Sequence, residues 1–449
     1  MSIGIFSRRR GALLRGLLIL ASIAVVSPAG ASPRVWQPLL LRGKQLPQLL
    51  NVPVSRIEVL AVHHGRLEPI PFQVDSVLIG GIYALPQGPV PTAIVGEQAV
   101  GPDDEITMMM FDLGERIPDT TVLPTGALEV AVTDPLGGPQ RYVYMAAVKN
   151  PRLSPAHYVD YDPRHEIVET DSYRLGFKNE FPDDFRLQSH KGELSQNLID
   201  GFELRGRVSL LNLIKVHLTE KDIKSRLLAY RVGPVRVIRR VGHRIEILKP
   251  IQSPEVSTVE FFYRDFGQAP FTMRLPWHRL FRDVQGTIAM EFMNLRGYSI
   301  LASGLEQPIE INNSGAAAII DHDTPATWLA LRGGGRLMLQ TFAPSADLDQ
   351  ITRELYYQAE PCRSGGPQCG LAAAVGIETD GWQRLSSGPH RFDPLLISAP
   401  ENYGARTAID EASTAVVVTV RVARQRSPNP SASVSRAVIS QAPLSEPGK

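Results

Sequence analysis

Cysteine is the scarcest residue type in this sequence. Its 449 residues hold only two, Cys362 and Cys369, which excludes a disulfide-dense scaffold. The absence of a C-x-x-C-H segment also excludes a covalently attached haem. In "CRSGGPQC" the two thiols can close a small loop across a flexible Gly-Gly-Pro turn. We expect a disulfide there rather than a zinc site, because no suitably spaced His or Cys accompanies the pair.

Familiar catalytic signatures are also missing. The sequence has no G-x-S-x-G, H-E-x-x-H, phosphate-binding P-loop or G-x-G-x-x-G segment, and each of these would place a known chemistry on a known local structure. No motif therefore names a reaction, and candidate functional residues have to be argued one by one.

Long hydrophobic runs are limited to the start of the chain. Four arginines precede "GLLILASIAVV", and the small residues Ala29 and Ala31 follow it. This order predicts a signal peptide over residues 1–31, and the apolar run is shorter than the ~20 residues a membrane anchor needs. We expect a periplasmic or secreted protein with no later transmembrane segment. The segment "SRRRGALL" faintly resembles a twin-arginine signal, so the export route stays open.

The charge is nearly balanced, and this argues against a nucleic-acid partner. Removing the four leader arginines takes the formal net charge from +1 to −3, which is unsuited to general binding of a phosphate backbone. The charge is unevenly placed, however: residues 97–134 carry a net −8 and residues 205–249 a net +9. Such asymmetry can steer a charged ligand, or the two segments can face each other.

The patterning predicts a mainly β protein. "RIEVLAVHHGRLEPIPFQVD" alternates as a hairpin, "ALEVAVTD", "QRYVYMAAV" and "TAVVVTVRVAR" read as strands, and 36 prolines with 37 glycines suit many turns. One helix is expected over 345–360, where apolar residues recur at three- and four-residue spacing.

The same patterning divides the chain. We expect an N-terminal β module over 32–150 and a larger β body over 165–424, because the strand rhythm breaks between them. The polar, Pro/Ser-rich segment 425–449 is predicted to be a disordered tail.

Two places gather reactive side chains. In "GPDDEITMMMF" the alternation of a strand lets Asp103 and Glu105 converge while Asp104 points away, and Asp75 could join them across a sheet. The hypothesis is a calcium site, but Gly-Pro-Asp-Asp is also ordinary turn chemistry, and we favour a turn that leads into a buried strand.

The second place is "IIDHDTPATWLALRGGGR". His322, flanked by Asp321 and Asp323, could act as a general base or a metal ligand, and Trp328 could stack on a sugar face. The alternative is a Pro-containing turn in which His322 only satisfies backbone groups.

Two segments carry a family resemblance. "PFQVDS" followed by "DDEITMMMF" resembles uncharacterised secreted bacterial proteins, and "GPVRV" resembles the corresponding strand of galactose-mutarotase-like supersandwich proteins. The resemblance implies a large, twisted, antiparallel double-sheet body of a kind that acts on or holds saccharides. The catalytic His and Glu of such enzymes have no recognisable counterparts here.

These observations favour a non-enzymatic protein that binds a saccharide or an envelope partner, with Arg236, Arg239, His322 and Trp328 as contacts and calcium as the one cofactor considered. The first alternative is a carbohydrate-active lyase, epimerase or hydrolase that uses His322 with Asp321 or Asp323. The second is a structural or accessory protein of an envelope assembly.

Overall fold

The fold is mainly β, as the sequence predicts. The computed structural model describes residues 34, 36–92, 98–118, 122–189, 192–210, 214–248, 251–274, 281–311, 325–344, 350–359, 371–385, 388–423 and 437–440. Every strand pair within these ranges is antiparallel.

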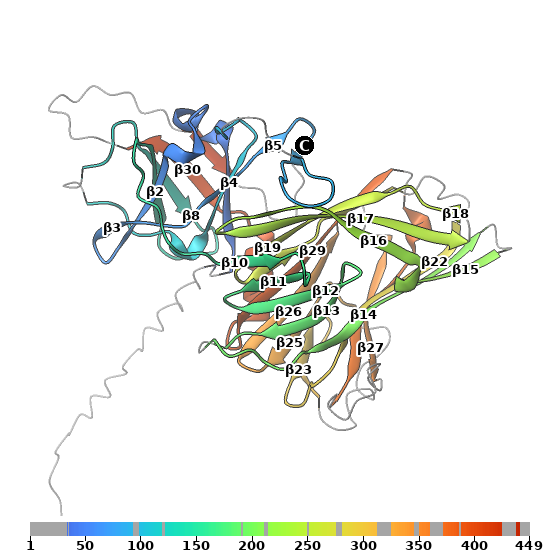
Figure 1. Ribbon diagram of the computed structural model, residues 1–449. Coiled ribbons are helices and arrows are strands. Elements are labelled where there is room, and N and C mark those ends of the chain that lie inside the picture. The colour runs from blue at the N-terminus through green and yellow to red at the C-terminus, as the bar shows by residue number, and fades with distance from the viewer. Residues whose placement is uncertain are drawn as a thin grey trace, which may run out of the picture.

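A smaller module contains most of the first 150 residues and lies at one end of the molecule (Figure 1). Its three-stranded sheet has the order β1 (Pro38–Arg42), β7 (Glu105–Met109), β4 (Gln73–Asp75). Its six-stranded sheet has the order β3 (Arg66–Pro69), β2 (Ile57–His63), β9 (Arg141–Ala147), β8 (Leu128–Thr133), β30 (Val417–Val422), β31 (Ala437–Ser440). A separate hairpin joins β5 (Val77–Leu78) to β6 (Ile82–Tyr83).

The larger body is built of three sheets. The four-stranded sheet has the order β10 (Val159–Asp162), β11 (Ile167–Thr170), β12 (Tyr173–Lys178), β13 (Phe181–Leu187). The five-stranded sheet has the order β15 (Ile214–Thr219), β14 (Ile199–Leu210), β22 (Phe281–Phe292), β28 (Ala373–Asp380), β27 (Thr352–Ala359).

The third sheet of the body has eleven strands. Its main path is β16 (Ile223–Val232), β17 (Arg236–Leu248), β19 (Val256–Tyr263), β20 (Phe266–Gln268), β29 (Pro389–Pro400), β26 (Arg336–Pro344), β25 (Trp328–Gly333), β23 (Ser299–Ala302), β24 (Ile309–Glu310). Off this path, β18 (Ile251–Gln252) pairs with β17, and β21 (Phe271–Arg274) pairs with β29.

The body is a double layer because its sheets share one core. Buried side chains of the four- and five-stranded sheets, such as Leu175 and Val375, pack with Leu331 and Met338 from one face of the eleven-stranded sheet. The opposite face of that sheet packs against a second core to which the first module contributes Trp36. The predicted double-sheet body with a smaller N-terminal β module is therefore confirmed.

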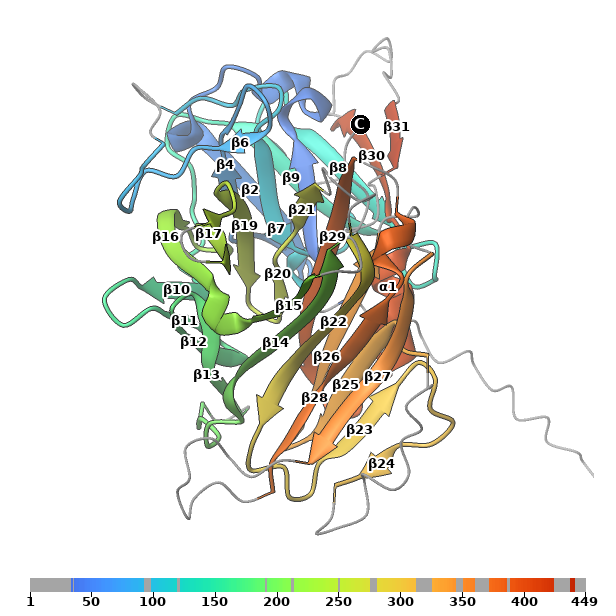
Figure 2. The same cartoon turned by 90° about the vertical axis from the view of Figure 1, so that its right-hand side faces the viewer.

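The chain crosses back to the first module at its end. Strand β30 lies beside β8 and pairs with it (Figure 2). Its Val418 and Val420 are buried in the core of the first module. Four residues of the predicted tail, Ala437–Ser440, form β31 beside it. In space, β30 and β31 therefore belong to the first module, whereas the sequence pattern placed these residues in the body and the tail.

The helix expected over 345–360 is wrong. Within that range, Thr352–Ala359 form strand β27, an outer strand of the five-stranded sheet that pairs with β28. The α-helix of the described residues is α1 (Ala405–Ser413), which buries Ala405, Ala408 and Ala412. No helix in the described ranges is long and apolar enough to cross a membrane.

Short 3-10 turns connect several of the strands. They are η1 (Gly43–Gln45), η2 (Pro47–Leu49), η3 (Val54–Arg56), η4 (Met110–Asp112), η5 (Glu220–Asp222) and η9 (Trp382–Arg384). Of these, η5 leads directly into β16, which brings the basic part of the chain to the edge of the largest sheet.

Candidate functional site

The acidic segment 103–105 divides between a turn and a buried ion pair. Asp104 is buried and accepts hydrogen bonds from the backbone N–H of Gly101 at 2.8 Å and of Val77 at 2.9 Å, so its carboxylate closes the turn before β7. Asp103 is exposed and lies 3.2 Å from Lys44 Nζ. Glu105 points instead toward the large body. The expected turn leading into a buried strand is what the structure has.

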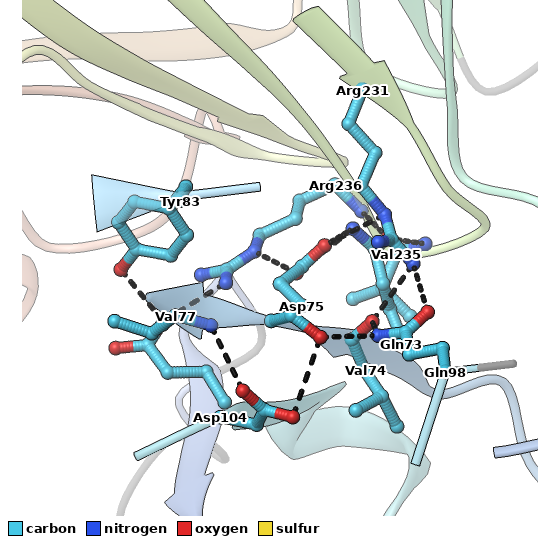
Figure 3. Close-up of polar contacts among 12 residues, drawn as sticks. Gln73, Val74, Asp75, Val77, Tyr83, Gln98, Asp104, Arg231, Val235 and Arg236 are labelled. Atoms are coloured by element: carbon cyan, nitrogen blue, oxygen red, sulfur yellow. Dashed lines mark hydrogen bonds and ion pairs between the residues drawn. The ribbon is translucent and has the colours of Figure 1, made fainter. Parts of the chain in front are cut away.

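Arg236 joins the two modules through a buried network (Figure 3). Its Nε lies 2.8 Å from Asp75 Oδ2 and its Nη2 lies 2.9 Å from Glu105 Oε2. Nη1 donates to Tyr263 Oη at 2.9 Å. Gln73 Oε1 accepts from the backbone N–H of Arg236 at 3.0 Å. Each nitrogen of the guanidinium therefore has a partner, and only 1% of the side chain is exposed.

The charge of Arg236 is held by these partners. Burial alone would lower its pKa, yet Tyr263, Asp75 and Glu105 raise the pKa well above the usual value. The ring of Phe261 also lies under the guanidinium carbon, 5.1 Å from ring centroid to Cζ. A calcium ion on Asp75 and Glu105 would have to displace this guanidinium.

Arg239, also on β17, forms a second buried ion-pair network, which lies within the body. Its Nη1 donates to Glu260 Oε2 at 2.8 Å and its Nη2 pairs with Glu180. Its guanidinium lies 3.9 Å from the centroid of the Phe177 ring. Arg236 and Arg239 were both expected to contact a ligand directly. Direct contact of these two side chains with a ligand stays a prediction. Their burial does not favour such contact.

The remaining predicted site residues fall in two groups. Trp328 begins β25, and its partly buried side chain packs against the core shared with the first module. Asp321, His322, Asp323, Cys362 and Cys369 lie outside the described residues. In the described ranges no group of three or more His, Cys, Asp or Glu side chains is arranged for a metal ion.

An open pocket of about 400 Å³ lies at the end of the eleven-stranded sheet. It is lined by Lys224, Ser225, Arg226, Arg244, Gln252 and Glu255. These residues come from β16, β17, β18 and the loop before β19. All six residues are polar or charged, with three cationic side chains against one carboxylate, although carbon atoms of these residues form most of the lining surface.

The strand register explains why the charges converge. Lys224 lies opposite Arg244 in the β16–β17 pair, so both side chains point to the same face of the sheet. Arg226 is two residues from Lys224 and shares that face. Glu255 lies between the two arginines: Arg226 Nη2 is 3.1 Å and Arg244 Nε 3.4 Å from its Oε2. The carboxylate therefore holds two guanidinium groups side by side.

His243 ties together the strands that carry the pocket. One ring nitrogen lies 2.8 Å from Ser225 Oγ on β16 and the other 2.9 Å from Thr258 Oγ1 on β19. Burial lowers the pKa of His243 below its usual value, although Glu255 raises it. The ring is then neutral at pH 7, with one nitrogen donating and the other accepting. We interpret this as a cross-strand hydrogen-bond ladder that positions Lys224, Arg244 and Glu255.

Four of the six pocket residues lie in the basic segment 205–249, but its net charge did not distinguish them from the buried arginines. Arg236 and Arg239 stand among Val and Ile, a context that indicates a strand buried on both faces. Lys224, Ser225 and Arg226 are polar at three consecutive positions, which indicates a strand end exposed on both faces. That contrast was the available signal for which cations face solvent.

Comparisons with known proteins find only distant structural similarity. No family model and no curated protein matches its sequence. An α-mannosidase structure from Enterococcus faecalis V583 is similar at 10% identity and a TM-score of 0.40, over 82% of this chain and 41% of that one. An aldose epimerase homologue from C. elegans is similar at 9% identity and a TM-score of 0.33, over 55% of this chain and 100% of that one. Both likenesses are too weak to add to the architecture described above.

Proposed function

We propose that this chain is an exported binding protein that holds an acidic saccharide in the pocket of Lys224, Arg226 and Arg244. The observation that carries this is the open pocket lined by polar and charged residues, in which Glu255 holds two guanidinium groups at one strand end. Export is supported by the leader-like pattern of residues 1–31.

The pocket chemistry favours an anionic sugar over a neutral one. Planar guanidinium groups match the geometry of a carboxylate, and Lys224 adds a further cation beside them. Glu255 and Gln252 supply acceptor oxygens and an amide donor for hydroxyl groups. No aromatic ring lines the pocket, so stacking on an apolar sugar face contributes little there. Recognition would rest on charge, and salt would weaken it.

The test is binding of purified residues 32–449 to matched oligosaccharides. Oligomers of a uronic acid and neutral oligomers of the same length should be compared by isothermal titration calorimetry at low and at 0.5 M salt. We expect at least tenfold tighter binding of the acidic series, lost at high salt. The double variant Lys224→Ala/Arg244→Ala should lose most of that preference, whereas Lys178→Ala, which removes an exposed cation on β12, should keep it. Equal binding of both series, or a double variant that binds like the parent, would show that the pocket is not the site.

The same titration also tests the calcium hypothesis. Binding should be unchanged by a chelator, because Asp75 and Glu105 already pair with Arg236. Chelator-sensitive binding would return those two carboxylates to consideration as cation ligands.

A further inference from the structure

The hairpin β5–β6 presents aliphatic side chains to solvent at its tip. Ile79 is 100% exposed, Ile82 48% and Leu78 37%. Gly80 and Gly81 form the turn with φ of 86° and 77°, a left-handed conformation that favours glycine. Single exposed aliphatic residues are common, but three gathered on one tip indicate a contact surface.

The base of the hairpin is held firmly, so the tip is displayed rather than loose. Val77 N–H donates to Asp104 Oδ1 at 2.9 Å, and Tyr83 Oη donates to Glu105 Oε2 at 2.9 Å. Glu105 is in turn paired with the buried Arg236. The network that joins the modules thus also fixes the base of the hairpin.

The chain after the hairpin runs along the edge of the largest sheet. Gln87 bridges to Tyr230 of β16, and Val90 N–H donates to the carbonyl of Leu228 at 2.7 Å. Arg240 reaches across from β17 and donates to the carbonyl of Val90 at 2.7 Å. Residues 76–92 contain no ionisable side chain except the hydroxyl of Tyr83.

Further along β16 and β17, other cationic side chains lie on the face of the sheet that carries Arg240. Arg240 and Arg244 are four residues apart on β17, so they share a face. Arg244 lies opposite Lys224, and these two side chains are 49% and 58% exposed. Lys224 lies 3.7 Å from Glu246, and Arg226 and Arg244 share Glu255. With Arg240, the four cations exceed these two carboxylates by two charges, so an uncharged aliphatic tip is followed along the sheet by a region of net positive charge.

We propose that this side docks on an anionic lipid bilayer, with the β5–β6 tip inserted among the lipids and the cations facing the headgroups. An aliphatic tip free of charge inserts into the boundary between headgroups and acyl chains, and each nearby Lys or Arg adds attraction to anionic lipid. A protein partner is less favoured, since interfaces of that kind are enriched in aromatic residues, Met and Arg, and the tip has none of them. The attraction of the cations to a charged surface does not depend on whether the pocket also holds a saccharide.

The experiment is co-flotation of residues 32–449 with vesicles; this range retains every described residue and omits the apolar leader, which would itself partition. Vesicles of phosphatidylcholine alone and of phosphatidylcholine with phosphatidylglycerol (3:1) should be compared. We expect binding to the anionic vesicles, reduced at least tenfold by Ile79→Asp and by 0.5 M salt. The matched control is Val122→Asp, since Val122 is 91% exposed but lies outside the hairpin; it should bind like the parent.

Thermal unfolding and titration with the acidic oligosaccharide should accompany each variant. Ile79→Asp should unfold at the parental temperature and keep its saccharide affinity, which separates docking from the proposed function. A parent protein that stays lipid-free with both vesicles overturns the docking proposal and leaves a protein partner for this tip. Equal losses in Ile79→Asp and Val122→Asp also overturn it, because the effect would then be one of surface charge alone.

Discussion

Arg236 is a fully buried side chain whose contacts cross the junction of the modules, next to Arg231, which also pairs with Asp75. The guanidinium of Arg236 binds Asp75 and Glu105 of the first module and Tyr263 of the body, and all but 1% of it is buried. Arg236→Ala would leave Glu105 without its cation, whereas Asp75 would keep Arg231 Nε at 3.1 Å. Breaking a buried pair in this way costs about 3–5 kcal/mol. We expect the midpoint of urea unfolding to fall accordingly.

The control for this prediction is an arginine that also pairs with a carboxylate but is exposed. Arg226 lies 3.1 Å from Glu255, with 58% of its side chain exposed. Exposed pairs contribute about 0–1 kcal/mol, so Arg226→Ala should leave the urea midpoint nearly unchanged. If both variants shifted the midpoint equally, the junction would not depend on Arg236.

The sequence could predict part of this residue-level arrangement. Asp103 and Asp104 were placed in a turn because Gly-Pro-Asp-Asp has the local chemistry of one. The pairing of Asp75 with Arg236 could not be predicted, since 161 residues separate them and no local pattern links them. The basic segment was visible as net charge, but only the fold decides which of its cations are buried.

At the level of elements, alternating apolar residues predicted strands correctly, whereas apolar residues at helical spacing did not by themselves identify a helix. The hairpin of β2 and β3 was predicted, with its turn at His64 and Gly65, both at positive φ. The segment 345–360 has apolar residues at helical spacing, but Leu355 and Tyr357 also alternate, and they pack into the body core from β27. Residues from Thr352 on are rich in Tyr and can pair with β28, so the sheet contact prevailed over the helical pattern.

The helix α1 was missed although its pattern was present. Ala405, Ala408 and Ala412 recur at three- and four-residue spacing and are buried together with Glu411. Alanine carries little weight as a hydrophobic residue, so its periodicity is easily overlooked. The helix packs in the core that the first module shares with the body.

A strand pair in the five-stranded sheet depends on a close approach at Gly376. This residue lies opposite Ala289 in the pair of β22 and β28. A Cβ there would overlap the carbonyl oxygen of Ile288 and lie 2.5 Å from the Cα of Ala289. Because the obstacle is backbone, Gly376→Ala has to push the two strands apart, and we expect a loss of at least about 2 kcal/mol in unfolding free energy.

Gly206 supplies the comparison within the same sheet. A Cβ at this position would lie 3.3 Å from the Cβ of Leu218, a side chain that can shift by a few tenths of an ångström. Gly206→Ala should cost less than about 1 kcal/mol. Hydrogen exchange should show faster exchange of the β22 and β28 amides in Gly376→Ala only. Unchanged exchange there would mean that the strands are not in such close contact.

At the scale of the whole molecule, the double layer followed from composition and alternation, whereas the path of the chain between modules did not. "TAVVVTVRVAR" was correctly predicted to be a strand, but β30 pairs with β8, nearly three hundred residues earlier. Several sheet edges could have accepted it, and periodicity does not choose between them. The burial of Val418 and Val420 in the first core is what ties the end of the chain to its beginning.

The N-terminal segment, α1 and the first module also meet at a buried carboxylate, whose ionisation should change the stability of the whole protein. Glu411 on α1 is 2% exposed. It accepts hydrogen bonds from Trp36 Nε1 at 2.8 Å and from Tyr403 Oη at 2.7 Å. Arg34, which donates to the Glu411 carbonyl at 2.8 Å, also pairs with Asp134 of the first module at 2.6 Å. Burial raises the pKa of Glu411 from 4.5 to about 7, against the opposing effect of these hydrogen bonds and of Arg34.

A raised pKa in the folded state means that folding favours the protonated carboxyl. The stabilisation from Glu411 is therefore complete below pH 4.5 and is lost as the pH rises to about 7, above which the loss is constant. Glu411→Gln keeps the shape of the neutral form and cannot ionise. We expect the variant to gain stability relative to the parent over this window, by at most about 3 kcal/mol. Urea unfolding of both proteins at pH 4.5, 6 and 8 measures this difference directly, and other titrating groups cancel in it. A difference that stays constant with pH would mean that Glu411 ionises as readily in the folded protein as in the unfolded chain, and that the site where the N-terminal segment, α1 and the first module meet is open to water.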